Sequence, residues 1–485
     1  MFNKVEEIRV QFLKKFEETE KYRSSVVFPV GTEEEIFPSF IVWSAVVIIF
    51  IIGNAPIDKI EEIIKSFLNI SSADLYHLVT NVVIPIKTLL FWFAFFVLFL
   101  PILRALIRSK ARFVQLDIKK LFLLTGSIFL FLVVLLILLI LVLQIPIETL
   151  FTYKTMGFYY RKMSYNPFKE PSGWYYRRLL MPALANLLHL GIASQVYSDS
   201  FYYFFSVVLT LILIFLSLVF LELKTLGIDS NNNNLSSEND LNKTNELPST
   251  SMDQKLKYLA YFSLFTAGFT MINLQWLGYP DQLFFILILI AACVPLTQHG
   301  RLGIIALSMI THETSCVTLI PIILFCYPKK ERLKGLFLIL IYILIFLTSF
   351  GFDLVAILNS QTIFVDRPAF LHLIIYPDVL LLGILFAYKF LWIIISYVLW
   401  RDWHNEERLL VVALISMLLL PFITLPFAGD TTRMICFGSM GLIISFSIFI
   451  KEFKTFPRQK VFLFLLIVNL LIPSIPIVIV LKEVL

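Results

Sequence analysis

The chain has 485 residues, of which 59% are hydrophobic, 15% aromatic and only 15% charged, and its mean hydropathy is +0.85. A soluble domain carries about 25% charged residues, so this composition excludes a single water-soluble core and indicates an integral membrane protein. The 40 Lys and Arg against 34 Asp and Glu are typical of basic cytoplasmic loops rather than of nucleic-acid binding. We therefore expect membrane lipids around the chain and no nucleic-acid partner.

Cysteines and the N-terminal residues carry little functional signal. We expect the four cysteines to be small buried hydrophobes, because they lie in apolar runs without CxxC or CxxH spacing. The first apolar run begins near Ile36, too late for a signal peptide.

Hydropathy predicts a polytopic, all-α protein, because a bilayer core requires helices of about 20 apolar residues. The expected spans are 37–53, 82–108, 119–145, 201–223, 256–274, 281–297, 334–351, 374–400, 408–427, 431–450 and 460–481.

The run 303–327 is a special case, since basic residues flank it on both sides and Thr311-His312-Glu313-Thr314 lies at its middle. One crossing would put the two basic flanks on opposite sides of the membrane. We therefore predict two short helices, 303–313 and 316–327, that meet at an outward turn. This raises the total to about 13 membrane segments, with the N-terminus in the cytoplasm.

The distribution of cations supports this orientation. In this topology 27 of the 40 Lys and Arg are cytoplasmic and 12 are on the outer side, as the positive-inside rule requires. Six of the outer cations lie in one loop, 146–178. The apolar stretch 179–196 that follows is predicted to stay at the outer interface without crossing. Residues 227–254 are rich in Asn, Ser and acidic residues, which is typical of a disordered cytoplasmic linker.

The outer loop is the first candidate site. Its Arg and Tyr side chains suit a phosphate-bearing headgroup or a sugar, because guanidinium groups match phosphate oxygens. The alternative is an interfacial aromatic belt with snorkelling cations.

Three further polar groups fall on the same outer side in this topology. Asp281 precedes a span directly, and it is either a functional carboxylate or a helix-start residue favoured by the dipole. His312 and Glu313 lie within an apolar run, as a site or as a polar pair that holds a helix break. Asp430 and Arg433 can share one helix face, as a site or as a local ion pair.

Several enzyme signatures are absent from the sequence. It has no nucleotide-binding loop, Rossmann fingerprint, GxSxG elbow or metal-ligand spacing, and HExxH fails because Cys316 replaces the second histidine. A cytoplasmic ATPase and a soluble-type hydrolase are therefore disfavoured.

The order of these features resembles the GT-C superfamily of polytopic glycosyltransferases. The stretch 176–184, with Arg177, Arg178 and Pro182, is similar to the Pro-Leu-rich stretch of that family's long outer loop. Asp281 is similar to the acidic residue that opens a later helix, and His312-Glu313 to the charged turn of a broken helix pair.

The resemblance covers roughly residues 119–330 and implies a domain organisation. Residues 1–118 hold a cytoplasmic segment and two extra helices, 119–226 a GT-C-like first half, 227–254 the linker, and 255–485 a C-terminal helical region. The chain departs from the family in one respect: its outer loop has no Asp before Asp199, only Glu148 and Glu170. Either a Glu replaces the family's early Asp, or the base comes from Asp281, Glu313 or Asp430, or the chain is a relative of the family with altered chemistry.

The resemblance implies inverting transfer of a sugar from a polyprenyl-phosphate donor at the outer face. A carboxylate would take the acceptor proton, and cations would stabilise the leaving phosphate. The implied catalytic residues are Asp281, Glu313, His312 and Asp430. The implied substrate-binding residues are Arg161, Arg177, Arg178 and Arg433 for phosphate and Tyr159 and Trp174 for sugar.

The resemblance also implies a location and partners. We expect a multi-pass cell-envelope protein of the bacterial inner membrane, with a lipid-linked sugar donor, no organic cofactor, and a divalent metal ion as an open alternative. Two other functions stay open: a polysaccharide polymerase or ligase acting on lipid-linked glycans, and a lipid or glycan transporter. The oligomeric state is not determined by the sequence.

Overall fold

The fold is known from a computed structural model of the chain. It describes residues 29–31, 34–54, 57–68, 70–114, 116–143, 157–169, 178–188, 195–225, 254–275, 279–348, 377–405, 407–427, 431–452 and 458–472. Within these ranges the chain is helical, apart from one isolated β-bridge between Val30 and Leu296. The all-α prediction is thereby confirmed.

The helices of the first half come from the predicted first spans and the outer loop. They are α2 (Ser39–Asn54), α3 (Ile57–Leu68), α4 (Ser72–Leu78), the π-helical turn η1 (Val79–Val83), α5 (Ile84–Arg108), α6 (Lys110–Phe113), α7 (Ile118–Leu143), α9 (Gly157–Tyr165), α10 (Leu180–Leu188) and α11 (Gln195–Thr225).

The second half is divided into shorter helices. They are α12 (Gln254–Phe265), α13 (Gly268–Gln275), α14 (Asp281–Cys293), α15 (Gln298–Thr311), α16 (Ser315–Cys326), α17 (Lys329–Thr348), α20 (Pro377–Tyr388), η5 (Lys389–Leu391), α21 (Trp392–His404), α22 (Arg408–Leu419), η6 (Leu420–Phe427), α23 (Thr431–Cys436), α24 (Ser439–Glu452) and α25 (Arg458–Leu471).

Among the residues that the structure describes, four helical stretches are long and apolar enough to cross a membrane. They are Ser72–Arg108, Ile118–Leu138, Phe201–Thr225 and Leu380–His404. This is fewer than the 13 segments expected, because many of the remaining apolar helices have only 10–17 residues. Helix α10, in the stretch predicted not to cross, has nine residues, too few to span about 30 Å of hydrocarbon by itself.

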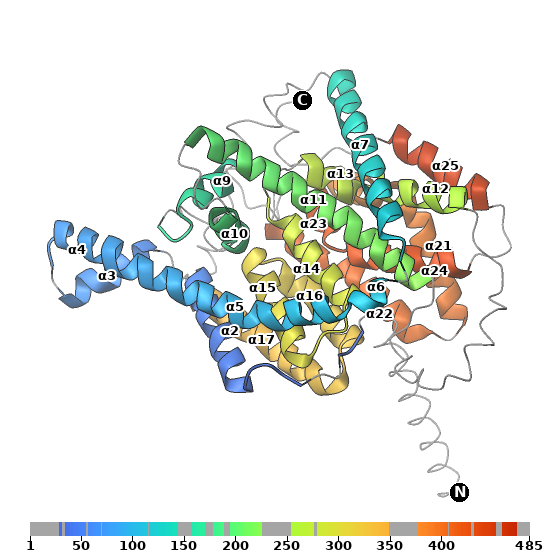
Figure 1. Cartoon of the computed structure of the whole chain (residues 1–485). Coiled ribbons are helices and arrows are strands. Elements are labelled where there is room, and N and C mark those ends of the chain that lie inside the picture. The colour runs from blue at the N-terminus through green and yellow to red at the C-terminus, as the bar shows by residue number, and fades with distance from the viewer. Residues whose placement is uncertain are drawn as a thin grey trace, which may run out of the picture.

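Most elements share one hydrophobic core (Figure 1). Its closest helix pairs include α11 with α14, α5 with α15, and α2 with α5. All four cysteines are buried in the described structure and free of disulfides, which agrees with their expected role as small hydrophobes. A second, small cluster around Ile57, Leu75 and Val79 holds α3 against α4, and this pair projects from the body as an arm.

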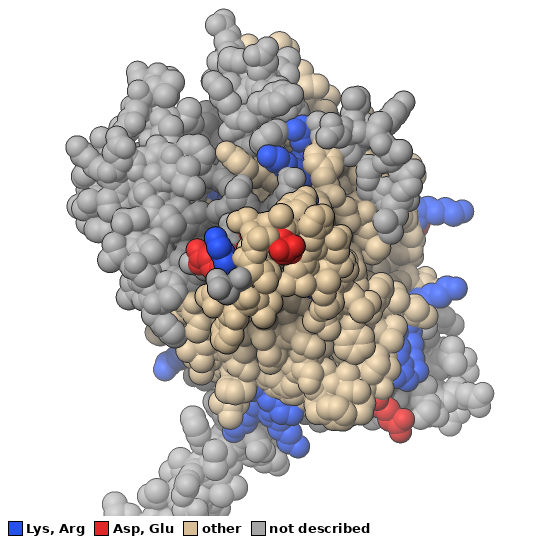
Figure 2. Space-filling view, turned by 90° about the vertical axis from the view of Figure 1, so that its left-hand side faces the viewer, with Lys and Arg blue, Asp and Glu red and all other residues tan. Residues whose placement is uncertain are grey.

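The outside of α5 is apolar. Exposed side chains recur every three or four residues along it, as a helix with one lipid-facing stripe requires. They include Ile86, Leu89, Phe93, Phe96, Leu100, Leu103 and Ile107. Figure 2, which looks onto the side where the arm projects, shows a mostly uncharged centre with Lys and Arg gathered along the lower edge. A lipid environment suits this exterior.

The predicted break in the run 303–327 is confirmed. Helix α15 ends at Thr311 and α16 begins at Ser315. His312 has extended backbone angles of −157° and 128°, so the helix stops there, and the turn holds Glu313 and Thr314.

Three other expected spans are interrupted, and here the uninterrupted predictions were wrong. The run 256–274 breaks at Thr266–Ala267, 374–400 at Lys389, and 431–450 at Phe437–Gly438. Each break has a local cause. Gly268 lies so close to the Phe386 carbonyl oxygen that an added Cβ would be 2.0 Å from it. Lys389 has a φ of 51°, a left-handed angle that ends an α-helix. A Cβ added to Gly438 would lie only 2.7 Å from the Tyr388 hydroxyl.

The segment before α2 caps the start of α15. The Glu35 carboxylate accepts hydrogen bonds from the Thr297 hydroxyl and the His299 backbone N–H, both at 3.0 Å. Thr297 is itself the N-cap residue, and its oxygen accepts from the Gly300 N–H. The first turn of α15 thus has its free N–H groups satisfied.

We expect Glu35→Ala to destabilise the protein by about 1–2 kcal/mol, the usual cost of losing a helix cap. The melting temperature of the purified protein in detergent measures this. Glu34→Ala is the matched control, since the Glu34 side chain is exposed and should have no effect. Equal melting temperatures for the two variants would contradict the capping role.

Candidate functional site

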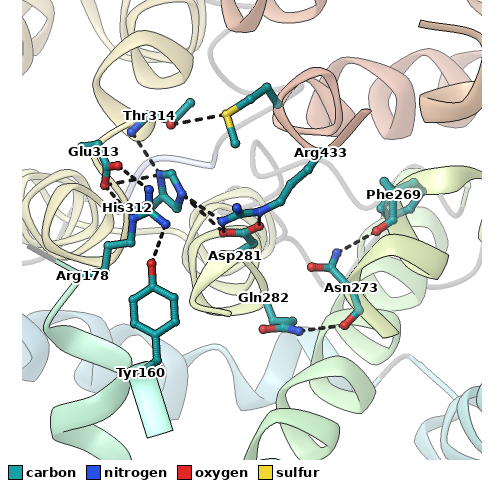
Figure 3. Close-up of polar contacts among 11 residues, drawn as sticks. Tyr160, Arg178, Phe269, Asn273, Asp281, Gln282, His312, Glu313, Thr314 and Arg433 are labelled. Atoms are coloured by element: carbon teal, nitrogen blue, oxygen red, sulfur yellow. Dashed lines mark hydrogen bonds and ion pairs between the residues drawn. The ribbon is translucent and has the colours of Figure 1, made fainter. Parts of the chain in front are cut away.

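Five of the residues singled out in the sequence converge on one cluster (Figure 3). Asp281 is the first residue of α14, and His312 and Glu313 lie in the turn between α15 and α16. Arg178 lies two residues before the start of α10, and Arg433 lies on α23. Hydrogen bonds and ion pairs link all five. Residues spread over more than 250 positions therefore meet at a single point.

The first ion pair of the cluster joins Arg433 to Asp281. Arg433 Nη2 donates to Asp281 Oδ1 at 2.8 Å, and Nε donates to Oδ2. The guanidinium also lies over the Tyr279 ring, 4.1 Å from its centroid, an arrangement that stabilises a cation. Both charged side chains are only 6% exposed.

The second ion pair joins Arg178 to Glu313. Arg178 Nε donates to Glu313 Oε2 at 2.8 Å, Nη2 donates to Oε1, and Nη1 donates to the Tyr160 hydroxyl. The side chains are 14% and 18% exposed. This pair is thus the more open of the two.

His312 lies between the two pairs and is fully buried. Its Nδ1 lies 3.2 Å from the Thr314 backbone nitrogen, and its Nε2 is 3.6 Å from Asp281 Oδ1 and 3.2 Å from Arg433 Nη2. A neutral ring accepts at only one of its two nitrogens, so the tautomer decides which of the Thr314 and Arg433 N–H groups it accepts from. Since two guanidiniums already balance two carboxylates, a neutral imidazole keeps the cluster without net charge.

The remaining predicted site residues lie on α9 or outside the described residues. Tyr159 and Arg161 lie on α9; Tyr159 is 38% exposed and Arg161 is half-buried. Asp430, Arg177 and Trp174 lie outside the described residues. Arg433 makes a bidentate contact with Asp281, and the local Asp430–Arg433 pair given as an alternative involves a residue outside the described ranges.

Two tyrosines of the cluster were not assigned a role from the sequence. Tyr160 is fully buried on α9, and its ring packs against Tyr279 with centroids 5.5 Å apart. The Tyr279–Tyr160 contact bridges the two ion pairs, since each ring also touches one guanidinium. The only sequence signal was their position beside charged residues.

The cluster offers chemistry for an anion and a proton. Each guanidinium could bind phosphate oxygens, and each carboxylate could accept a proton, but both carboxylates are held by arginines. The implied carboxylates and the implied phosphate-binding arginines are therefore joined in two ion pairs. A phosphate that binds the same guanidinium nitrogens would displace a carboxylate.

An apolar cavity adjoins the cluster. It lies between α11, α13, α14, α16 and α24, and its lining includes Phe284, Ile288, Ile322 and Phe437. Phe437 also packs against His312, with ring centroids 4.8 Å apart. Its free volume is only about 10 Å³, room for about one water molecule, so apolar side chains fill most of the space beside the charged groups.

Across the described ranges, no group of three or more His, Cys, Asp or Glu could hold a metal ion. No protein-family model matches the chain, and no curated protein or solved structure matches it either.

Proposed function

We propose that the protein is a membrane glycosyltransferase of the GT-C type, which moves a sugar from a polyprenyl-phosphate donor to an acceptor at the outer face of the membrane. One observation carries the proposal: Asp281, His312, Glu313, Arg178 and Arg433, chosen as carriers of this chemistry, form one buried cluster. Helix caps and interfacial aromatic belts would have no reason to converge.

The proposal includes a topology. The N-terminus is cytoplasmic, the cluster faces outward, and the shorter helices complete a set of about 13 membrane segments in a bacterial inner membrane. The arrangement agrees with the chain's cation distribution, in which the cytoplasmic loops hold most Lys and Arg.

The mechanism follows from the groups present. A guanidinium binds the donor phosphate and stabilises the charge that grows as the phosphate leaves. A carboxylate accepts the proton of the acceptor hydroxyl, which attacks the anomeric carbon from the opposite side and inverts its configuration.

The acceptor distinguishes this enzyme from a polysaccharide polymerase or ligase, which would use the same cluster on a lipid-linked glycan.

A transporter is the second candidate function, and the burial of Lys389 favours it. This lysine is 1% exposed at a helix break, and its ammonium donates to the Asn469 carbonyl oxygen at 2.7 Å, a kind of residue that marks transport pathways.

We expect deletion of the gene to make a polyprenyl-phosphate sugar accumulate and one envelope glycan lose that sugar. Mass spectrometry of lipid-linked sugars and envelope glycans with and without the gene measures both. Wild-type protein and the arm variant Glu62→Gln should restore the glycan. If the protein were a transporter, deletion of its gene would leave the lipid-linked sugar on the cytoplasmic face, where membrane-impermeant periodate does not reach it. Profiles that do not change on deletion would contradict the proposal.

A further inference from the structure

We infer that the two ion pairs have different tasks, an assignment that rests on the proposed function. The Arg178–Glu313 pair is exchangeable: the donor phosphate displaces Glu313 from Arg178, and the released carboxylate becomes the base. The Arg433–Asp281 pair stays closed and holds His312 in place. Tyr160 is a positioning residue that keeps Arg178 in its phosphate-binding orientation.

The exposure of the two pairs is the first argument. The side chains of Arg178 and Glu313 are 14% and 18% exposed, whereas those of Arg433 and Asp281 are both 6% exposed. An anion that arrives from solvent therefore meets Arg178 first. Opening the deeper pair would leave a buried charge without its partner, which is the costlier event.

The second argument is the position of each carboxylate in the chain, because both carboxylates are bound by two guanidinium nitrogens and lie 3.6 or 3.7 Å from a His312 nitrogen. Asp281 is the first residue of helix α14, and its partner Arg433 lies on α23 with its guanidinium over the Tyr279 ring. Glu313 sits on a turn between two helices, where its side chain can swing without breaking a helix. Glu313 is thus the carboxylate that can be released.

The geometry of Arg178 suits the exchange. Its Nε and Nη2 hold the two carboxylate oxygens side by side, and the same planar fork matches two phosphate oxygens. The third nitrogen, Nη1, stays on the Tyr160 hydroxyl and fixes the plane of the fork. The phosphate takes the place of the carboxylate with no rotation of Arg178.

The released Glu313 then lies next to the bound phosphate, and the chemical step balances. The acceptor oxygen forms a bond to the anomeric carbon and gives its proton to Glu313. The bond between the anomeric carbon and the phosphate oxygen breaks, and its electron pair leaves on the polyprenyl phosphate. Arg178 carries the counter-charge of that leaving group.

Binding of a polyprenyl monophosphate to the purified protein in nanodiscs tests the exchange. Glu313→Gln should bind this probe at least as tightly as wild type, because Arg178 is freed from a competing anion. The same variant should lower transfer in cells by about 10²- to 10⁴-fold, the usual effect of losing a general base. Arg178→Met should lose binding of the probe.

Tyr160→Phe tests the positioning role. Loss of one hydrogen bond to the guanidinium should raise the KM for the donor by about tenfold with little change in kcat. A merely structural role would lower the amount of folded protein and leave both constants of the folded fraction unchanged, and that result would overturn the assignment of Tyr160.

The outcomes separate this inference from the proposed function. If wild-type protein neither binds the probe nor supports transfer, the proposed function fails. If wild type does both but Glu313→Gln transfers normally, or Arg178→Met still binds the probe, the exchange is wrong. Asp281→Asn that folds and lacks transfer, beside an active Glu313→Gln, would give the role of base to Asp281.

Discussion

Asp281→Ala should destabilise the protein by about 3–5 kcal/mol, because it leaves the buried Arg433 guanidinium without its carboxylate. Both side chains are 6% exposed, so water cannot replace the missing partner. We expect a large fall in the melting temperature of the detergent-purified protein and a low yield of monodisperse protein. This cost is structural, so loss of transfer in this variant would not identify Asp281 as a base.

Two control variants test whether the lost stability comes from the unpaired buried charge. The double variant Asp281→Ala/Arg433→Met removes both charges and should recover much of the lost stability, since a neutral pair leaves no unpaired buried ion. Asp117→Asn removes the charge of an exposed pair with Lys120, whose side chains are 51% and 57% exposed, but keeps an oxygen that can accept from the Lys120 N–H at the start of α7, and it should leave the melting temperature nearly unchanged. A double variant as unstable as the single one would contradict the ion-pair explanation.

The members of the site were predictable from the sequence, but their pairing was not. Charged residues are costly near an apolar run, so Asp281 and Glu313 could be singled out individually. Their partners lie 152 and 135 residues away in the chain, and no local spacing relates them. For the same reason Tyr160 went unnoticed: its importance comes from Arg178, which meets it only in the folded chain.

Some of the helix breaks could likewise be predicted from the sequence, and others could not. The break at His312 was predictable because basic residues on both flanks require an even number of crossings. The breaks near Gly268 and Lys389 lie inside apolar runs with no such flanks. At Gly268 the chain lies close to the Phe386 carbonyl oxygen, and at Lys389 the backbone has a left-handed φ of 51°; hydropathy contains no information on either feature.

A close approach of this kind should also reverse the usual effect of a glycine substitution in α15. Replacing Gly by Ala in a helix interior normally stabilises it by about 1 kcal/mol. At Gly303, however, an added Cβ would lie 2.5 Å from the Leu98 carbonyl oxygen of α5. This atom is backbone within a helix and cannot turn aside, so we expect Gly303→Ala to destabilise the protein by about 1–3 kcal/mol and Gly303→Val to do so more severely.

Gly126 provides the matched control, because it lies in the exposed part of α7 with nothing within 4 Å of its Cβ position. Gly126→Ala should hold or raise the melting temperature in detergent, so the same chemical change gives opposite signs at the two positions. The effect at Gly303 should extend to the site, because α15 carries His312 and Glu313 at its far end. Pushing α15 away from α5 moves that turn relative to Arg178, so Gly303→Ala should also weaken binding of a polyprenyl monophosphate. A Gly303→Ala protein as stable as Gly126→Ala would show that α5 and α15 are not in this close contact, and the position of the turn would then need another support.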